Sequence, residues 1–109
     1  MFRTENGAVY ITRGDSASLE ILLTNAEGAV YNLAEGDTLT LSVKRSVMDT
    51  EVLISKKITS GKIISFNPQD TSDLAFGEYR YDVQLNTKAG KVYTVIGPDS
   101  FFVCEEVTV

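Results

Sequence analysis

Apolar and polar residues alternate along several stretches of this 109-residue chain. In the clearest of them, Tyr79, Tyr81, Val83 and Leu85 are separated by single polar residues. Because successive side chains of a β-strand point to opposite faces, a period of two predicts a half-buried strand. The same period recurs over residues 18–24 and 38–44, and weaker alternation predicts strands over residues 8–12, 30–32, 52–58, 62–66, 91–96 and 100–109.

Short segments rich in Gly and Asp separate these runs and predict turns, because Gly adopts positive φ and Asp bonds its own backbone. Examples are Arg13-Gly14-Asp15, Glu35-Gly36-Asp37 and Gly97-Pro98-Asp99. A single helical turn is predicted at residues 70–74, with Asp70 as its cap and Asp73 completing a capping box. Strands recurring at intervals of roughly 8 to 12 residues predict an all-β antiparallel sandwich or barrel of about seven to nine strands. No linker interrupts the pattern, so we expect one domain over residues 1–109.

The segment that leads into the clearest strand carries the most specific structural signal. A short turn is followed by Gly77, and Tyr79 stands near the start of the alternating run. This arrangement resembles the tyrosine corner of immunoglobulin-like sandwiches, in which the phenol hydroxyl bonds to the backbone upstream. The resemblance implies an immunoglobulin-like antiparallel β-sandwich. The paired cysteines and buried tryptophan of antibody domains are missing here.

Composition removes most catalytic chemistry. The chain has no His, no Trp and one cysteine, Cys104, so Ser-His-Asp and Cys-His catalysis, His-ligated zinc and an internal disulfide lack their residues. The carboxylates do not follow the spacing of a calcium-binding EF-hand loop, and none stands in the apolar setting that would suit an acid in glycoside hydrolysis. We therefore expect no enzyme activity, no cofactor and no metal site.

The balance of charge bears on the class of partner. Fifteen acidic residues against ten basic ones give a formal net charge of -5. Phosphate binding needs clustered positive charge, so a nucleic-acid partner is not expected. No apolar stretch reaches the ~18 residues of a membrane span, and the polar segment at the start of the sequence does not predict a signal peptide.

The tripeptide Arg13-Gly14-Asp15 has two interpretations. It matches the sequence that many integrins read, which would make it an adhesion site. It also has the chemistry of a tight turn leading into a strand, as does the parallel turn at Glu35-Gly36-Asp37. The structural interpretation is favoured, because adhesion needs a long, protruding loop.

The two predicted strands at the end of the sequence are apolar on both faces. Tyr93 and Val95 share a face opposite Val92 and Ile96, and Phe102 opposes the face that carries Phe101, Val103 and Val107. A second apolar face must be covered by another element or by a partner. We therefore name Tyr93, Val95, Phe101, Val103 and Val107 as a candidate interface, with a homo-oligomer as one outcome.

The order of motifs along nearly the whole chain resembles small immunoglobulin-like β-sandwich proteins of tailed bacteriophages and prophages. The pattern is similar to the N-terminal domain of phage baseplate upper proteins. The motifs that carry the likeness are, in order, Gly14-Asp15-Ser16 before a strand, Ala29-Val30-Tyr31-Asn32-Leu33, Glu35-Gly36-Asp37-Thr38-Leu39, Phe66-Asn67-Pro68, Asp70-Thr71, Gly77-Glu78-Tyr79-Arg80-Tyr81-Asp82-Val83-Gln84-Leu85 and Val92-Tyr93-Thr94-Val95-Ile96-Gly97-Pro98.

The resemblance implies a structural role in a virion, tail or baseplate, without catalysis. The partners would be other virion subunits or further copies of this chain, and the location the virion, or the bacterial cytoplasm before assembly. A module that binds carbohydrate or a cell surface is the alternative, with Tyr10, Tyr31 and Tyr93 as aromatic platforms. The absence of Trp weighs against this alternative.

Overall fold

The computed structural model describes residues 2–5, 7–25 and 27–105, and almost all of its regular structure is β-strand. The expectation of an all-β chain is confirmed. The strands are β1 (Phe2–Glu5), β2 (Ala8–Thr12), β3 (Ala17–Glu20), β4 (Leu23–Thr24), β5 (Val30–Tyr31), β6 (Thr38–Lys44), β7 (Ile54–Ile58), β8 (Ile63–Phe66), β9 (Gly77–Asn86) and β10 (Val92–Cys104). One short helix, α1 (Pro68–Thr71), lies between β8 and β9.

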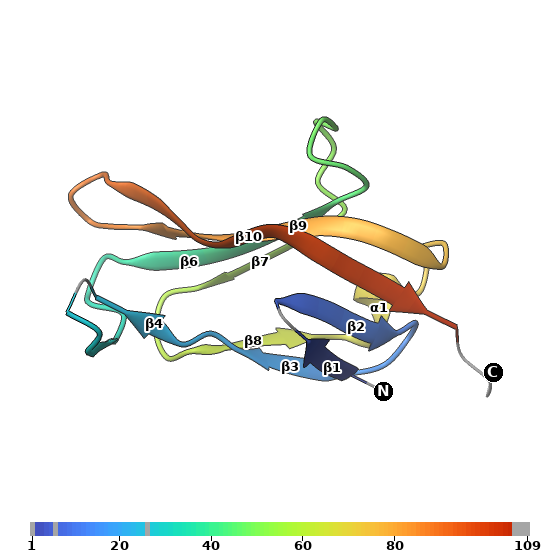
Figure 1. Cartoon of the computed structure of the whole chain (residues 1–109), viewed down its shortest axis with the longest axis horizontal. Helices are drawn as coiled ribbons and strands as arrows, with labels where there is room; N and C mark the ends of the chain where they lie inside the picture. Colours follow the sequence, from blue (N-terminus) through green and yellow to red (C-terminus); the bar gives the residue numbers. More distant parts are fainter. Residues whose placement is uncertain (1, 6, 26, 106–109) are drawn as a thin grey trace.

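Six strands form one sheet in the order β1-β2-β10-β9-β6-β7, and the pairs β3-β8 and β4-β5 are separate. All of these pairings are antiparallel except that of β2 with β10, which is parallel. In Figure 1, β6, β9 and β10 lie above β3, β4 and β8, and β1 and β2 lie at the end nearest the chain termini. The apolar side chains of the two layers meet between them.

Strict alternation in β6 and β9 places one face of the large sheet in the core. Leu39, Leu41 and Val43 are buried, whereas the polar residues between them are only half-buried. Burying an aliphatic or aromatic side chain of this size contributes about 1.5–3 kcal/mol. The core also contains Val9, Ile11, Leu19, Ile21, Leu23, Ile54, Ile64, Phe66, Tyr79, Tyr81, Val83, Leu85, Phe101 and Val103.

The predicted turn at Gly97-Pro98-Asp99 is wrong, because these residues lie inside a single long strand, β10. The pairing of β10 with β9 shifts twice, between Thr94 and Ile96 and between Ile96 and Asp99. Each shift adds one residue to β10, which is the signature of a β-bulge. The strand bends there instead of reversing, so the Gly-Pro-Asp chemistry marks an irregularity in a strand.

Other boundaries also differ from the sequence prediction. The run over residues 18–24 is divided between β3 and β4, the N-terminal strand β1 was not expected, and the described residues form ten strands in place of seven to nine. The helical turn begins at Pro68 and has Asn67 as its N-cap. Asp70 occupies the third helical position, where its carboxylate accepts a hydrogen bond from the Asn67 N–H at 2.7 Å. Pro68 explains the shift, because its fixed φ and missing N–H suit the first helical position.

Candidate binding site

The predicted interface on β10 separates into a buried part and an open part. Phe101 and Val103 are 0% and 2% exposed, so their assignment to an interface is wrong. They pair with Tyr79 and Gly77 on β9, and their side chains belong to the core of the chain itself. Val107 lies outside the described residues. Alternation shows that a strand has an apolar face, but not which element covers it.

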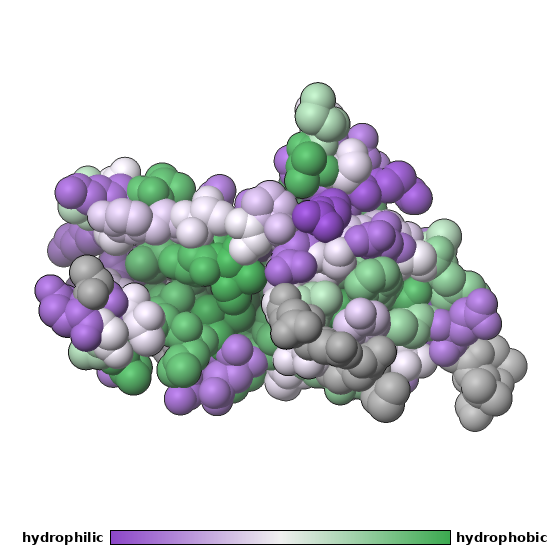
Figure 2. All heavy atoms as spheres, viewed as in Figure 1, coloured by the Kyte–Doolittle hydropathy of each residue, from purple (hydrophilic) through white to green (hydrophobic). Residues whose placement is uncertain are grey.

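Tyr93 and Val95 lie farther along the same face, at the open end of the core. Together with residues of β4, β5 and β9 they line a cleft of about 550 Å³. Figure 2 shows hydrophobic residues gathered in the left half of the view, between β4 and the layer above it. The lining consists of Leu23, Thr24, Asn25, Tyr31, Leu85, Thr87, Tyr93 and Val95.

The apolar residues of this cleft differ in exposure and come from two hairpins. Leu23 and Leu85 are nearly buried and close its inner side, whereas Tyr93 is 48% exposed. Tyr31 is the pairing partner of Leu23 in the β4–β5 hairpin, and Tyr93 is the partner of Leu85 in the β9–β10 hairpin. One tyrosine therefore comes from each hairpin, and their ring faces and neighbouring aliphatic groups make the cleft chiefly apolar.

Asp37 holds Tyr31 in place. The Tyr31 hydroxyl donates a short hydrogen bond to the Asp37 carboxylate, which also accepts from the Ala34 N–H at 2.9 Å. The hydrogen bond from Tyr31, followed by those from backbone N–H groups, lowers the pKa of Asp37 from its ordinary value. The same hydrogen bond raises the pKa of Tyr31, because it stabilises the protonated phenol. Tyr31 therefore lines the cleft as a neutral phenol whose orientation is fixed by the hydrogen bond to Asp37.

The polar side chains at the rim of the cleft form hydrogen bonds within the turns of the two hairpins. The Asn25 side-chain oxygen accepts from the N–H groups of Glu27 and Ala29, both at 3.0 Å. On the other hairpin, the Thr87 hydroxyl accepts from the Lys91 N–H at 3.1 Å. These bonds hold the hairpins that form the cleft. They also use acceptor atoms that a polar ligand would require.

The loop over residues 45–53 carries Met48, the most exposed large hydrophobic side chain in the described part of the chain. It connects β6 to β7 and projects away from the large sheet, in green above it in Figure 1. Met48 is 87% exposed and Val47 is 56% exposed. The signal for this loop in the sequence is the apolar pair Val47-Met48 between charged and polar residues, which predicts neither a buried strand face nor an ordinary polar turn.

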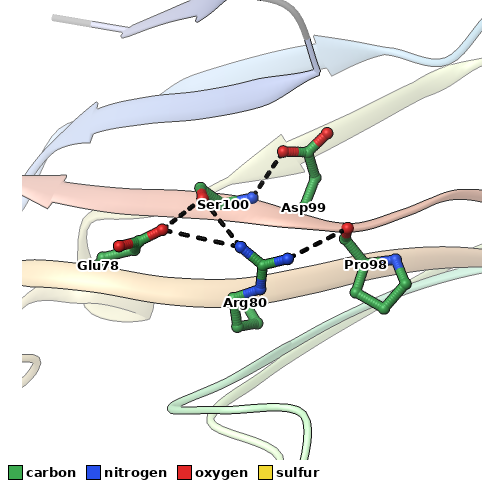
Figure 3. Close-up of polar contacts among 5 residues, drawn as sticks. All are labelled: Glu78, Arg80, Pro98, Asp99 and Ser100. Atoms are coloured by element: carbon green, nitrogen blue, oxygen red, sulfur yellow. Dashed lines mark hydrogen bonds and ion pairs between the residues drawn. The ribbon is translucent and has the colours of Figure 1, made fainter.

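A polar network covers the outer face of β9 and β10 (Figure 3). The Arg80 guanidinium donates to the Ser100 hydroxyl at 3.0 Å and to the Pro98 carbonyl at 3.3 Å, and the Ser100 hydroxyl donates to Glu78. Bulges leave backbone groups without ladder partners, so Arg80 stabilises the irregular part of β10 by binding one of them. The adjoining hollow, of about 210 Å³, is lined by Ser42, Lys44, Val47, Arg80, Tyr81, Asp82 and Pro98.

The Arg13-Gly14-Asp15 segment forms a tight turn packed against the protein. The Asp15 N–H donates to the Thr12 carbonyl at 3.1 Å, and the Gly14 N–H donates to the Thr71 hydroxyl at 2.8 Å. The Arg13 guanidinium lies 4.2 Å from the centre of the Phe76 ring. All three residues are half-buried, so the protruding loop that the adhesion interpretation requires is not formed.

Two other tyrosines, Tyr79 and Tyr10, make contacts within the fold and do not line the cleft. The Tyr79 hydroxyl donates to the Ala75 carbonyl at 2.7 Å, the upstream backbone bond expected of a tyrosine after Gly77. Tyr10 lies on the outer face of the sheet, where its ring stacks on Phe102 with the centroids 4.6 Å apart. Tyr10 is therefore separate from the cleft. Of the three tyrosines considered as sugar platforms, only Tyr31 and Tyr93 come together.

The acidic residues of the sequence do not converge on a metal-binding arrangement in the ranges described above. No group of three or more His, Cys, Asp or Glu side chains there could hold a metal ion. Asp70 instead pairs with Lys56 at 2.7 Å. Within the same ranges, no helix has the length and apolar character that crossing a membrane would require. Comparisons with protein-family models and with curated proteins found no match for this chain.

Proposed function

We propose that this chain is a non-catalytic structural component of a tailed bacteriophage or prophage, an immunoglobulin-like β-sandwich that docks onto other proteins. The sequence resemblance supports the phage assignment. The two layers, the parallel contact of β2 with β10 and the Tyr79 hydrogen bond are compatible with an immunoglobulin-like sandwich.

The observation that carries the proposal is the apolar cleft between the two hairpins. A core normally closes at its ends, and an exposed apolar hollow with a polar rim is typical of a protein-contact site. Tyr31 and Tyr93 add rigid aromatic area, and aromatic residues are common at the energetic centre of interfaces. Docking through this cleft would bury the apolar surface that the chain leaves open.

Particles released from the bacterium that carries this gene provide the test. Prophage induction, followed by purification of tailed particles, should yield the chain by mass spectrometry, and gold-labelled antibody should mark one position on every tail. A strain with the gene deleted is the control and should give unlabelled particles. Tailed particles that lack the chain in the parent strain would refute the proposal.

Carbohydrate binding is the second candidate, because Tyr31 and Tyr93 meet in the cleft. Sugars need hydrogen-bonding groups beside an aromatic face, and the side-chain oxygens of Asn25, Asp37 and Thr87 already accept hydrogen bonds from the chain itself. The apolar walls therefore favour a protein occupant. A glycan-array signal lost in Tyr93→Ala and kept in Tyr10→Ala would reverse this order, since Tyr10 lies outside the cleft.

A further inference from the structure

The chain carries an apolar cleft and an apolar projection of its own. The cleft between the β4–β5 and β9–β10 hairpins holds about 550 Å³. The loop over residues 45–53 presents Met48 at its surface, 87% exposed, next to Val47. Methionine is unbranched and flexible, so it fills apolar hollows of irregular shape. The same molecule thus offers both a hollow and a side chain suited to it.

The loop and the cleft of one molecule cannot meet. β6 begins with Thr38 opposite Asn86, at the cleft end, and ends with Lys44 opposite Arg80, where the loop begins. At a rise of about 3.3 Å per residue, the seven residues of β6 separate the two ends by roughly 20 Å. Figure 1 shows the β9–β10 hairpin and the 45–53 loop at separate places on the molecule. Any contact between them must therefore join two molecules.

The charges next to Met48 and those of the β9–β10 hairpin are opposite in sign, whereas Arg45 at the start of the loop and Glu27 in the β4–β5 hairpin carry the reverse signs. Asp49 and Glu51 follow Met48 in the loop, and both are exposed. Lys88 and Lys91 belong to the hairpin that forms one side of the cleft, and both are also exposed. Two carboxylates beside the projection would approach two ammonium groups beside the hollow. Opposite charges at the rim of an interface increase the association rate and select the orientation of the partner.

We propose that the cleft receives the 45–53 loop of a second copy of this chain, with Met48 between Tyr31 and Tyr93. This inference rests on the proposed function and names the partner of its docking site. Because the two surfaces differ, the contact is heterologous: each molecule uses its loop toward one neighbour and its cleft toward another. Repetition of such a contact gives a closed ring when the rotation closes and a filament when it does not.

The first experiment measures the mass of the purified chain by light scattering after size-exclusion chromatography, from about 1 μM to about 1 mM. The wild type should form oligomers whose mass rises with concentration toward a closed ring or a filament. Met48→Asp and Tyr93→Asp should each weaken association by at least about tenfold. Ile63→Asp is the control, because Ile63 is an exposed apolar residue of β8 that belongs neither to the loop nor to the cleft lining. Unchanged melting temperatures would show that the variants are folded.

Mixing the two variants separates a heterologous contact from a symmetric one. Met48→Asp keeps an intact cleft and Tyr93→Asp keeps an intact loop, so an equimolar mixture should form one-to-one dimers that grow no further. A symmetric dimer made by either surface would not be restored by mixing. A second test combines the charge reversals Asp49→Lys and Lys88→Glu, which should each weaken association while their mixture recovers it.

Three results would overturn the inference: a monomer throughout the concentration range, an oligomer insensitive to Met48→Asp, or variants that fail to associate when mixed. These results are independent of particle labelling. A monomeric chain found in tailed particles would refute the second copy as the occupant and leave the structural function in place. An oligomer formed by a chain that is absent from tailed particles would refute the structural function and leave the second copy as the occupant of the cleft.

Discussion

The hydroxyl of Tyr81 donates a hydrogen bond to the carbonyl oxygen of Gly7, a residue 74 positions away in the sequence. The contact joins the turn between β1 and β2 to the centre of the large sheet. Burial of the phenol, with a smaller contribution from the Asp99 carboxylate, raises the pKa of Tyr81 to about 12. An ionised Tyr81 could not donate this hydrogen bond, so the contact depends on the protonated form.

This shift predicts a loss of stability at high pH. Below pH 10, the hydroxyl is protonated in both the folded and unfolded chain and makes no pH-dependent contribution. Between about pH 10 and about pH 12 the unfolded chain releases the proton first, so the free energy of unfolding falls as the pH rises. In Tyr81→Phe this fall should be shallower. Urea denaturation at pH 9, 10 and 11 measures it, and parallel curves for the two proteins would contradict the assignment.

Asp37 predicts an effect of the opposite sign at low pH. Its pKa is lowered by the Tyr31 hydroxyl, so its contribution is present above the ordinary value of 3.8 and is lost as the pH falls through the lower folded pKa. Tyr31→Phe removes the main cause. The variant should therefore lose less stability than the wild type between pH 6 and pH 3 in urea titrations. Tyr93→Phe, across the same cleft, is the control and should lose as much stability between pH 6 and pH 3 as the wild type.

Tyr79→Phe tests the hydrogen bond to Ala75. A bond of this kind contributes about 0.5–1.5 kcal/mol, and the value here should lie toward the lower end, because water can reach the exposed Ala75 after the change. The phenyl ring keeps its place in the core. Urea denaturation should show a lower midpoint with an unchanged slope. A midpoint equal to that of Tyr93→Phe would show that the hydroxyl adds nothing.

Phe101 and Tyr93 should respond differently to truncation, although both were named in one candidate interface. Phe101 is fully buried, and Phe101→Ala should lower the free energy of unfolding by about 3–5 kcal/mol. Tyr93 is half-exposed, so Tyr93→Ala should cost less than half as much. If Phe101→Ala does not fold, Phe101→Leu should still show a loss of roughly 1 kcal/mol. A Phe101→Ala protein of wild-type stability would contradict the core assignment and return Phe101 to the candidate interface.

Gly97 in β10 should be harder to replace than Gly61, which lies between β7 and β8. The φ of Gly97 is +85°, and a Cβ there would lie 2.6 Å from the Tyr81 carbonyl oxygen and 2.9 Å from the Asp99 nitrogen. Gly61 has a φ of +71° and open space around the same position. Both alanine variants carry the left-handed penalty of about 1–2 kcal/mol, but only Gly97→Ala also forces the backbone to move. Thermal unfolding should therefore rank Gly97→Ala well below Gly61→Ala.

Local patterns predicted the parts of the fold that depend on neighbouring residues. The alternation of Leu39, Leu41 and Val43 located β6 and its buried face, and the approach to Tyr79 through Gly77 predicted an upstream hydrogen bond. These signals work because the geometry of a strand or a tight turn extends over only a few residues. The same local chemistry misled at Gly97-Pro98-Asp99, where turn-forming residues mark bulges in β10.

The sequence by itself determined that this chain folds from β-strands and lacks the residues of the common catalytic groups. Only the tertiary structure decided which apolar face of β10 is covered, that Phe101 and Val103 belong to the core, and that Tyr31 and Tyr93 share one open cleft. The reason is physical. An apolar pattern states that a face must leave water, whereas the element that covers it comes from a distant part of the chain through strand pairing.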